Sequence, residues 1–380
     1  MKKQFLILLV IFILWIVWYI RYTRPLSLSI QDPGEKMFQL SQRTLPSAWP
    51  MMDKIFQSKT DTTTSETWRI LIEKVDKKLT QYSSVHSGMY AYGGSGEILS
   101  IDDKKIINAL SWSEVRWFVD YKLQQTNDLI KKYDIVVPEW SDYATAIPSW
   151  VGPQAIVRLW SAYAYIDCTA GNIDQCRTTY DILFRFSQKM KDGWTLIQTL
   201  IGSTMENIVL NHVKYLLEKD FIKYNPLKEM LQQNQYIWAE KVFQNAMKTE
   251  YWTYKNTMNN IDMNNRIATM DMVNVMGSDD WVIWIINNWL YSLSVMVLPK
   301  SSLFDREQTH AMARYFFYIQ SISGVETLSE DNGLRDYWNG PIWSRPNMIG
   351  RISLEAMIPR LTWIHTRLQD IENFYMSIIQ

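Results

Sequence analysis

The chain has 380 residues, and its 39 lysines and arginines balance 39 aspartates and glutamates, so the formal charge at neutral pH is zero. A chain without an overall basic field is not expected to bind nucleic acid through its charge. The two cysteines lack the nearby histidines that a zinc site needs. We therefore expect no nucleic-acid partner, no metal site and no cofactor.

The first 24 residues predict a membrane anchor. An uncharged apolar run from Phe5 to Ile20 lies between Lys3 and Arg21. As a helix this run is about 24 Å long, slightly less than the roughly 30 Å hydrocarbon core of a bilayer, but flanking basic side chains can reach both surfaces. A cleaved signal peptide is the alternative, and it should end in a small-residue cleavage site, which is not visible after the run.

This anchor sets the expected domain organisation. Residues 1–24 are the transmembrane segment, residues 25–60 with their four prolines are a stalk, and residues 61–380 are an all-helical extracytoplasmic domain. Long domains are translocated largely regardless of their charge, which favours a cytoplasmic N-terminus. The expected localisation is a single-pass membrane protein with most of the chain outside the cytoplasm.

Cys168 and Cys176 flank the sequence Thr169-Ala170-Gly171-Asn172, which is typical of a tight turn between two helices. A short helical hairpin brings its inner ends close enough for a disulfide, and a bond of this kind suits an oxidising compartment. In the loop-entropy model so small a ring stabilises the fold by about 2.5 kcal/mol. Two free, buried thiols are the alternative. We favour the disulfide.

Helical periodicity recurs along the chain, whereas no segment shows the period-two alternation of a strand. The predicted fold class is all-α, a large multi-helix bundle or superhelical domain behind the anchor. A capping box at Thr63–Glu66 predicts the first helix, which a Gly-rich loop follows. The later helices are expected at about residues 102–133, 153–168, 173–192, 195–216, 226–233, 236–256, 305–321 and 348–379.

A second apolar run, Val282–Leu298, contains no charged residue. Its adjacent Asn287 and Asn288 would be costly inside a bilayer. We interpret the run as a buried core helix, with a second membrane span as the alternative.

Several short motifs lie between Pro153 and Pro359. They are Arg158-Leu159, Ala170-Gly171-Asn172, Thr195-Leu196-Ile197 with Leu200-Ile201-Gly202, Glu250, and Asn347-Met348-Ile349-Gly350-Arg351. In these motifs the chain loosely resembles a group of membrane-anchored, all-helical bacterial proteins. The resemblance covers a little over half of the sequence and consists of packing patterns. It implies an architecture and no particular reaction.

Few residues suggest chemistry. The sequence has neither a Gly-x-Ser-x-Gly elbow nor a His-Glu-x-x-His zinc motif. Glu307 and His310 have the spacing of half a di-iron site, but the second pair that such a site needs is missing, so we expect local hydrogen bonding. Glu206 and Glu250 lie in apolar helical contexts that could raise a carboxyl pKa, and they are weak candidates for a catalytic carboxylate pair.

Two functions from different classes follow. The first is a membrane-tethered helical scaffold that binds a protein partner in the cell envelope. The alternative is a glycan-cleaving or glycan-binding envelope enzyme in which Glu206 and Glu250 act across a cleft. In the first case each glutamate is a buried group that an arginine such as Arg158 or Arg351 neutralises. We favour the scaffold over the enzyme.

Overall fold

The computed structural model describes residues 10, 12–17, 19–20, 30–40, 45–48, 113–136, 151–193, 195–260, 304–323, 347, 350–351, 353–354 and 362–380. Within these residues the regular secondary structure is helical, and one isolated bridge joins Ser47 to Asp134. The all-α class is therefore confirmed for the described chain. The helix expected after Thr63, the Gly-rich loop and the run Val282–Leu298 lie outside these residues.

The helices follow the predicted order along the chain. Their bounds are η1 Glu35–Phe38, α5 Ser113–Lys132, α6 Val151–Thr169, α7 Ile173–Lys191, α8 Leu196–Lys219, α9 Phe221–Gln233, α10 Ala239–Asn260, α14 Arg306–Ser323 and α17 Thr362–Ile379.

The chain forms two compact units. The first contains residues 1–39, 139–145 and 250–363, and the second contains residues 40–138, 146–249 and 364–380. Helix α10 contributes to both, because its residues up to 249 belong to the second unit and the rest to the first. We describe each unit by itself.

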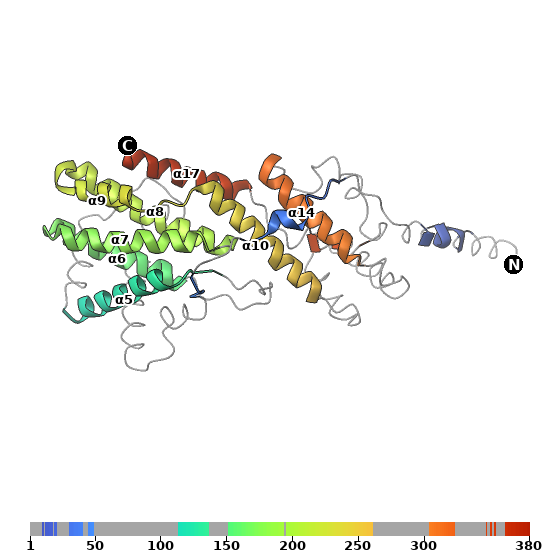
Figure 1. Cartoon of the computed structure of the whole chain (residues 1–380), viewed down its shortest axis with the longest axis horizontal. Helices are drawn as coiled ribbons and strands as arrows, with labels where there is room; N and C mark the ends of the chain where they lie inside the picture. The colour runs from blue at the N-terminus through green and yellow to red at the C-terminus, as the bar shows by residue number, and fades with distance from the viewer. Residues whose placement is uncertain are drawn as a thin grey trace. The chain divides into compact units, whose positions relative to one another are not determined.

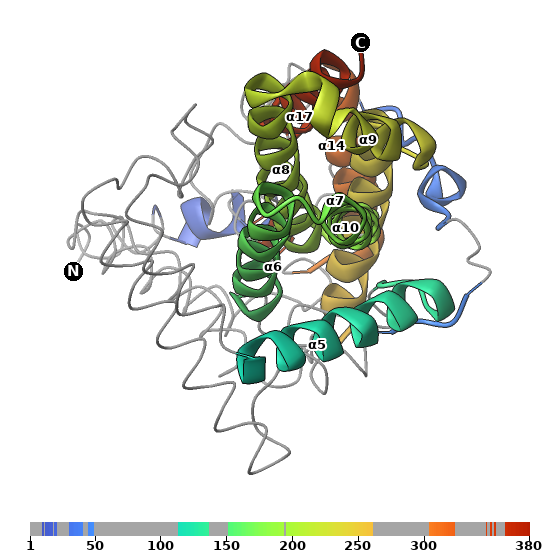
Figure 2. The same ribbon diagram turned by 90° about the vertical axis from the view of Figure 1, so that its left-hand side faces the viewer.

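Helix α7 is the centre of the second unit, where it packs against α5, α6, α8 and α9. Figure 1 shows α7 lying alongside α6 and α8, and Figure 2, which looks almost along α7, shows α5 from the side. Helix α5 therefore crosses α7 at a large angle. Large side chains of α7 such as Tyr180, Phe184 and Phe186 are completely buried, and α8 adds buried apolar residues such as Met205 and Val209 to the same core.

Side-chain caps fix where α8 and α9 begin. The backbone N–H of Gln198 donates to Thr195 Oγ1, and the N–H of Lys223 donates to Asp220 Oδ1. Each bond satisfies a donor that the first turn of a helix leaves without an intrahelical partner. The expected start of α9 at Pro226 is wrong, because the Asp220 cap starts the helix at Phe221 and Pro226 lies inside it.

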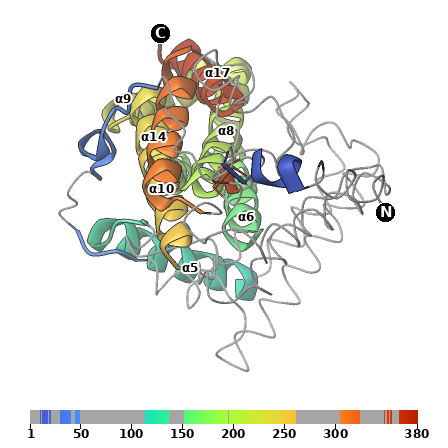
Figure 3. The same cartoon turned by 90° about the vertical axis from the view of Figure 1, so that its right-hand side faces the viewer.

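In the first unit, α14 runs antiparallel to the last part of α10, and the two helices lie side by side in Figures 1 and 3. Arg314 Nη1 donates to the Tyr251 hydroxyl at 3.0 Å, and further along α10 His310 Nε2 lies 3.1 Å from Asn259 Oδ1. The Tyr251 ring also meets Phe317 edge-on.

The described residues between Val10 and Ile20 are helical and expose apolar side chains. The predicted span starts at Phe5, and residues 1–9 lie outside the described part of the chain. Among the described helices we find none whose length and apolar character are sufficient for crossing a membrane.

Candidate functional site

Glu206, the first candidate carboxylate, is completely buried in the middle of α8 and forms an ion pair with Lys191 at the end of α7. Lys191 Nζ donates to Glu206 Oε2 at 2.6 Å, and the two side chains are 2% and 0% exposed. The expected arginine partner of Glu206 is therefore wrong, because the neutralising cation is a lysine. Neither charge is hydrated by solvent, so each is stabilised only by the other charge and by neighbouring protein groups.

Close contact between the two helices positions this pair. Gly202 of α8 lies against the backbone of Lys191, where a Cβ would overlap the Lys191 nitrogen and the carbonyl carbon of Met190. The Thr199 hydroxyl donates to the Lys191 carbonyl oxygen at 3.1 Å. The end of α7 is thus fixed against α8, and this places the ammonium beside Glu206.

A stack of three aromatic rings lies beside the pair. Lys191 Nζ lies 4.2 Å from the centroid of the Tyr236 ring, and Tyr236 stacks on Tyr375 with centroids 4.1 Å apart. Phe184 stacks on Tyr375 from α7. Burial, followed by the charge of Glu206, raises the pKa of Tyr236 far above its ordinary value. The site therefore holds a neutral phenol, a cation and a carboxylate in a covered, aromatic environment.

Sequence reasoning missed Lys191, although a signal for it exists. Lys191 lies seven residues after Phe184 and three after Gln188, and these intervals place all three on one helical face. That face is the buried one, since Phe184 and Gln188 are both covered. A lysine on the apolar face of an otherwise well-patterned helix predicts a buried acidic partner.

The second candidate carboxylate, Glu250, lies in α10 and is 7% exposed. It belongs to the first compact unit, whereas Glu206 belongs to the second. The two candidate carboxylates therefore belong to different compact units. His310, the other residue considered for chemistry, is hydrogen-bonded to Asn259, and the residues that the structure describes contain no group of three or more metal-ligating side chains.

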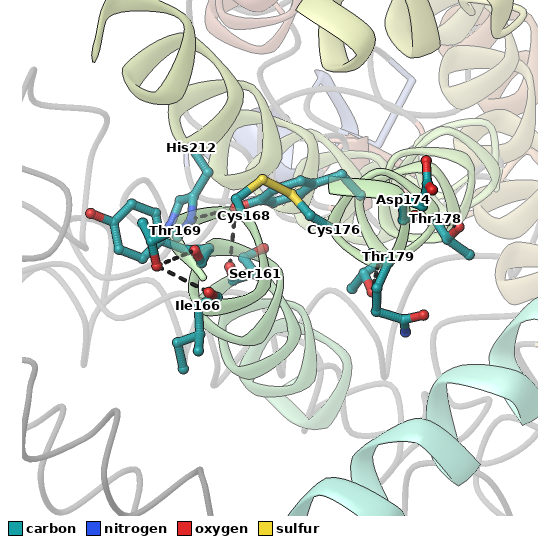
Figure 4. Close-up of a disulfide and its surroundings, with 12 residues drawn as sticks. Ser161, Ile166, Cys168, Thr169, Asp174, Cys176, Thr178, Thr179 and His212 are labelled. Carbon is teal, nitrogen blue, oxygen red and sulfur yellow. Dashed lines mark hydrogen bonds between the residues drawn. A yellow bond between two sulfur atoms is a disulfide. The ribbon is translucent and has the colours of Figure 1, made fainter. Parts of the chain in front are cut away.

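The disulfide is confirmed. Cys168 and Cys176 are bonded across the α6–α7 turn, with Cα atoms 5.2 Å apart. Gly171 has a φ of 90°, which glycine adopts without the strain of other residues, and the Asn172 N–H donates to the Asp167 carbonyl. Figure 4 shows the bond between Cys168 and Cys176 in this hairpin.

A polar network lies beside the disulfide. The Tyr180 hydroxyl donates to the Ser161 carbonyl at 3.1 Å and lies 3.2 Å from His212 Nδ1. Figure 4 draws Ser161 and His212 in the surroundings of the disulfide. Packing around the imidazole lowers the pKa of His212 to about 4, so the ring is neutral near neutral pH.

The motifs that carry the resemblance have structural roles where the structure describes them. Thr195 caps α8, and Gly202 allows the close approach of α7. In the first unit, buried Asn347 has a φ of 57°, and its Oδ1 accepts the N–H of Asp305 at 2.9 Å. A Cβ on Gly350 would overlap the Thr309 hydroxyl. These residues have roles in capping and close packing.

Two consecutive apolar residues, Phe221 and Ile222, are exposed where α8 connects to α9, and we call them the apolar step. Phe221 is 53% exposed and Ile222 is 88% exposed. Lys228 Nζ lies 5.6 Å from the centroid of the Phe221 ring, and Lys223 follows the step directly. We call Lys219, Phe221, Ile222, Lys223 and Lys228 the α8–α9 corner.

Two tyrosines fix one cation of this corner. Lys219 Nζ donates to the Tyr165 hydroxyl at 3.2 Å and lies 4.5 Å from the centroid of the Tyr215 ring. These contacts raise the pKa of Lys219 above its ordinary value. The neighbouring Asp220 carboxylate accepts the backbone N–H of Lys223 and so caps α9. The corner therefore presents apolar surface with polar residues at its edge, as the apolar core and polar rim of a protein interface do.

Comparison with known proteins identifies no relative: no family model, no curated protein and no solved structure matches the chain.

Proposed function

We propose that the chain is a membrane-anchored, extracytoplasmic helical scaffold that binds a protein partner in the cell envelope through the α8–α9 corner. The observation that carries this proposal is the exposure of the neighbouring Phe221 and Ile222, of which Ile222 is the most exposed large apolar side chain among the described residues. An isoleucine that is 88% exposed leaves most of its apolar area in water, and a partner that covers it gains about 25 cal/mol for each Å² removed from water.

The charges of the corner indicate what the partner is like. Lys219, Lys223 and Lys228 surround the apolar step, and nearby Glu218 is directed toward Lys214. A complementary surface combines an apolar knob or groove with carboxylates, because opposite charges steer encounter and exclude wrong partners.

Two further observations support the location. The described side chains between Val10 and Ile20 include Phe12, Leu14 and Trp15, which are 43% to 63% exposed. Apolar helical side chains of this kind suit lipid, in agreement with the proposed anchor at residues 1–24. The disulfide suits an oxidising, extracytoplasmic compartment.

Photo-crosslinking in intact cells tests the proposal. A photoreactive amino acid at position 222 of the full chain is expected to form an adduct with one envelope protein, and Phe221→Glu is expected to reduce its yield. The matched control places the same probe at Lys131, an exposed polar residue of α5. Equal adducts at positions 222 and 131, or adducts that Phe221→Glu leaves unchanged, would contradict the proposal.

A parallel assay tests the enzyme alternative. The full chain is incubated with isolated cell-wall glycan, and soluble fragments are measured for the parent, Glu206→Gln and Glu250→Gln. The scaffold proposal expects no release by any of the three. Release by the parent that both variants lose would replace the scaffold with the carboxylate-pair enzyme.

A further inference from the structure

Residues 30–39, which we call the strap, are attached to the first unit. This segment follows the proposed anchor and falls within the range expected to be a stalk. Phe38 is completely buried, its ring centroid is 4.5 Å from that of Tyr251, and its carbonyl accepts the indole N–H of Trp252 at 2.7 Å. The strap therefore contributes a core side chain to the last part of α10.

Charged contacts fix the strap at two further points. Arg314 of α14 binds Asp32 through two nitrogens, with Nε donating to Oδ1 at 2.8 Å and Nη2 donating to Oδ2. Lys255 of α10 forms an ion pair with Glu35. Paired guanidinium and carboxylate groups of this fork geometry are among the stronger charge-assisted contacts.

These contacts form a connected network. Tyr251 accepts a hydrogen bond from Arg314 Nη1 and lies against Glu35, so one phenol links both ion pairs. Gly34, with a φ of 79°, turns the strap between the two acidic residues, and its N–H donates to Asp32 Oδ1 at 2.9 Å. Glycine is suited to this turn because its left-handed backbone carries no Cβ penalty.

Chain length then bounds the distance from the membrane. Asp32 lies eight positions after Arg24, the last residue of the proposed anchor. Even fully extended, eight residues span at most about 29 Å. The point where α14 binds the strap thus lies within that distance of the anchor's outer end.

We propose that the strap holds the α10–α14 pair of the first unit at the membrane surface. This inference rests on the proposed membrane anchor.

Two spin labels on the full chain test whether the strap is attached. Cysteines replace Met37 of the strap and Glu307 of α14, which are both exposed, and the distance between the labels is measured by pulsed electron resonance. The parent is expected to give one narrow distance, and Asp32→Arg is expected to lose it. Adding Arg314→Asp to Asp32→Arg restores the opposite charges and is expected to regain the narrow distance.

A matched control removes charges elsewhere. Glu218→Gln with Glu229→Gln neutralises two exposed acidic residues of the second unit and is expected to leave the narrow distance unchanged. A broad distribution of label distances in the parent, or a narrow distribution that persists in Asp32→Arg, would contradict the attachment of the strap to α14.

Energy transfer then tests the position relative to the membrane. A donor at position 307 of the full chain in lipid nanodiscs is expected to transfer energy to acceptor-labelled headgroups, and Asp32→Arg is expected to reduce the transfer. Failure of the chain to enter nanodiscs would contradict the proposed anchor, while the spin-label distance would still decide the strap. A narrow distance without energy transfer would overturn the placement at the membrane.

Discussion

The Lys191 ammonium lies 2.6 Å from the Glu206 carboxylate inside the second unit, and both side chains are almost completely shielded from solvent. Charges in this position lose their hydration, and the fold tolerates the loss because each charge neutralises the other.

Removing one partner is expected to destabilise the second unit strongly. Lys191→Met leaves Glu206 buried without its cation, and the free energy of unfolding should fall by about 3 to 5 kcal/mol. Chemical denaturation monitored by circular dichroism measures the change. The double variant Lys191→Met with Glu206→Leu removes both charges and should regain most of the loss. A single variant as stable as the parent would show that the pair is not isolated from water.

The contact between Gly202 and Lys191 predicts a steric effect. Gly202→Ala places a methyl group on the backbone of α7, and separating the helices should cost about 1 to 3 kcal/mol. Gly171→Ala is the matched comparison, since a Cβ there meets open space but must adopt a φ of 90°. Its cost should be about 1 kcal/mol. Thermal unfolding of both variants measures which substitution destabilises the protein more. A larger loss of stability for Gly171→Ala than for Gly202→Ala would contradict this prediction.

Removing the disulfide should lower stability through the unfolded state. Cys168→Ala with Cys176→Ala reopens the small ring, and the free energy of unfolding is expected to fall by about 2.5 kcal/mol. The reduced parent protein is the control and should match the double variant in urea. An unchanged urea midpoint in both would indicate that the hairpin needs no covalent restraint.

The half-buried His212 predicts acid sensitivity. The folded pKa of His212, about 4, is below its ordinary value of 6.5, so the unfolded chain binds the proton first as the pH falls. The contribution to stability is complete above about pH 6.5, declines between 6.5 and 4, and amounts to at most about 3 kcal/mol.

Urea denaturation at several pH values between 4 and 7 measures this effect. His212→Gln should weaken the pH dependence relative to the parent. Burial also lowers the pKa of His310 to about 4, so His310 should act in the same direction. The stability of a variant with both histidines replaced by glutamine should depend less on pH than that of either single variant. Equal slopes for the parent and His212→Gln would contradict the assignment.

Local patterns predicted most of the described helices. The expected ranges 153–168 and 195–216 agree closely with α6, Val151–Thr169, and α8, Leu196–Lys219. Apolar periodicity, the glycine turn at Gly171 and the capping residue Thr195 all act within a few residues of the helix that they define. The same local signals predicted the disulfide, because its cysteines flank one short turn.

Contacts between distant residues could not be predicted in this way. Asp32 and Arg314 are 282 positions apart, and no local property of either residue identifies the other. The start of α9 was missed for a different reason. Pro226 strongly favours the first turn of a helix, but the cap at Asp220 starts the helix five residues earlier, at Phe221. The position of Lys191 on a buried face predicts an acidic neighbour without specifying Glu206.

The strap and the disulfide hairpin also differ in when they can form during synthesis. Cys176 leaves the ribosome only eight residues after Cys168, so the hairpin can close while most of α8 is still missing. Arg314 follows Asp32 by 282 residues, which corresponds to roughly 15 to 60 s at ordinary elongation rates. A nascent chain held by its first segment would therefore complete the second unit's α6–α7 hairpin long before the strap finds its partner.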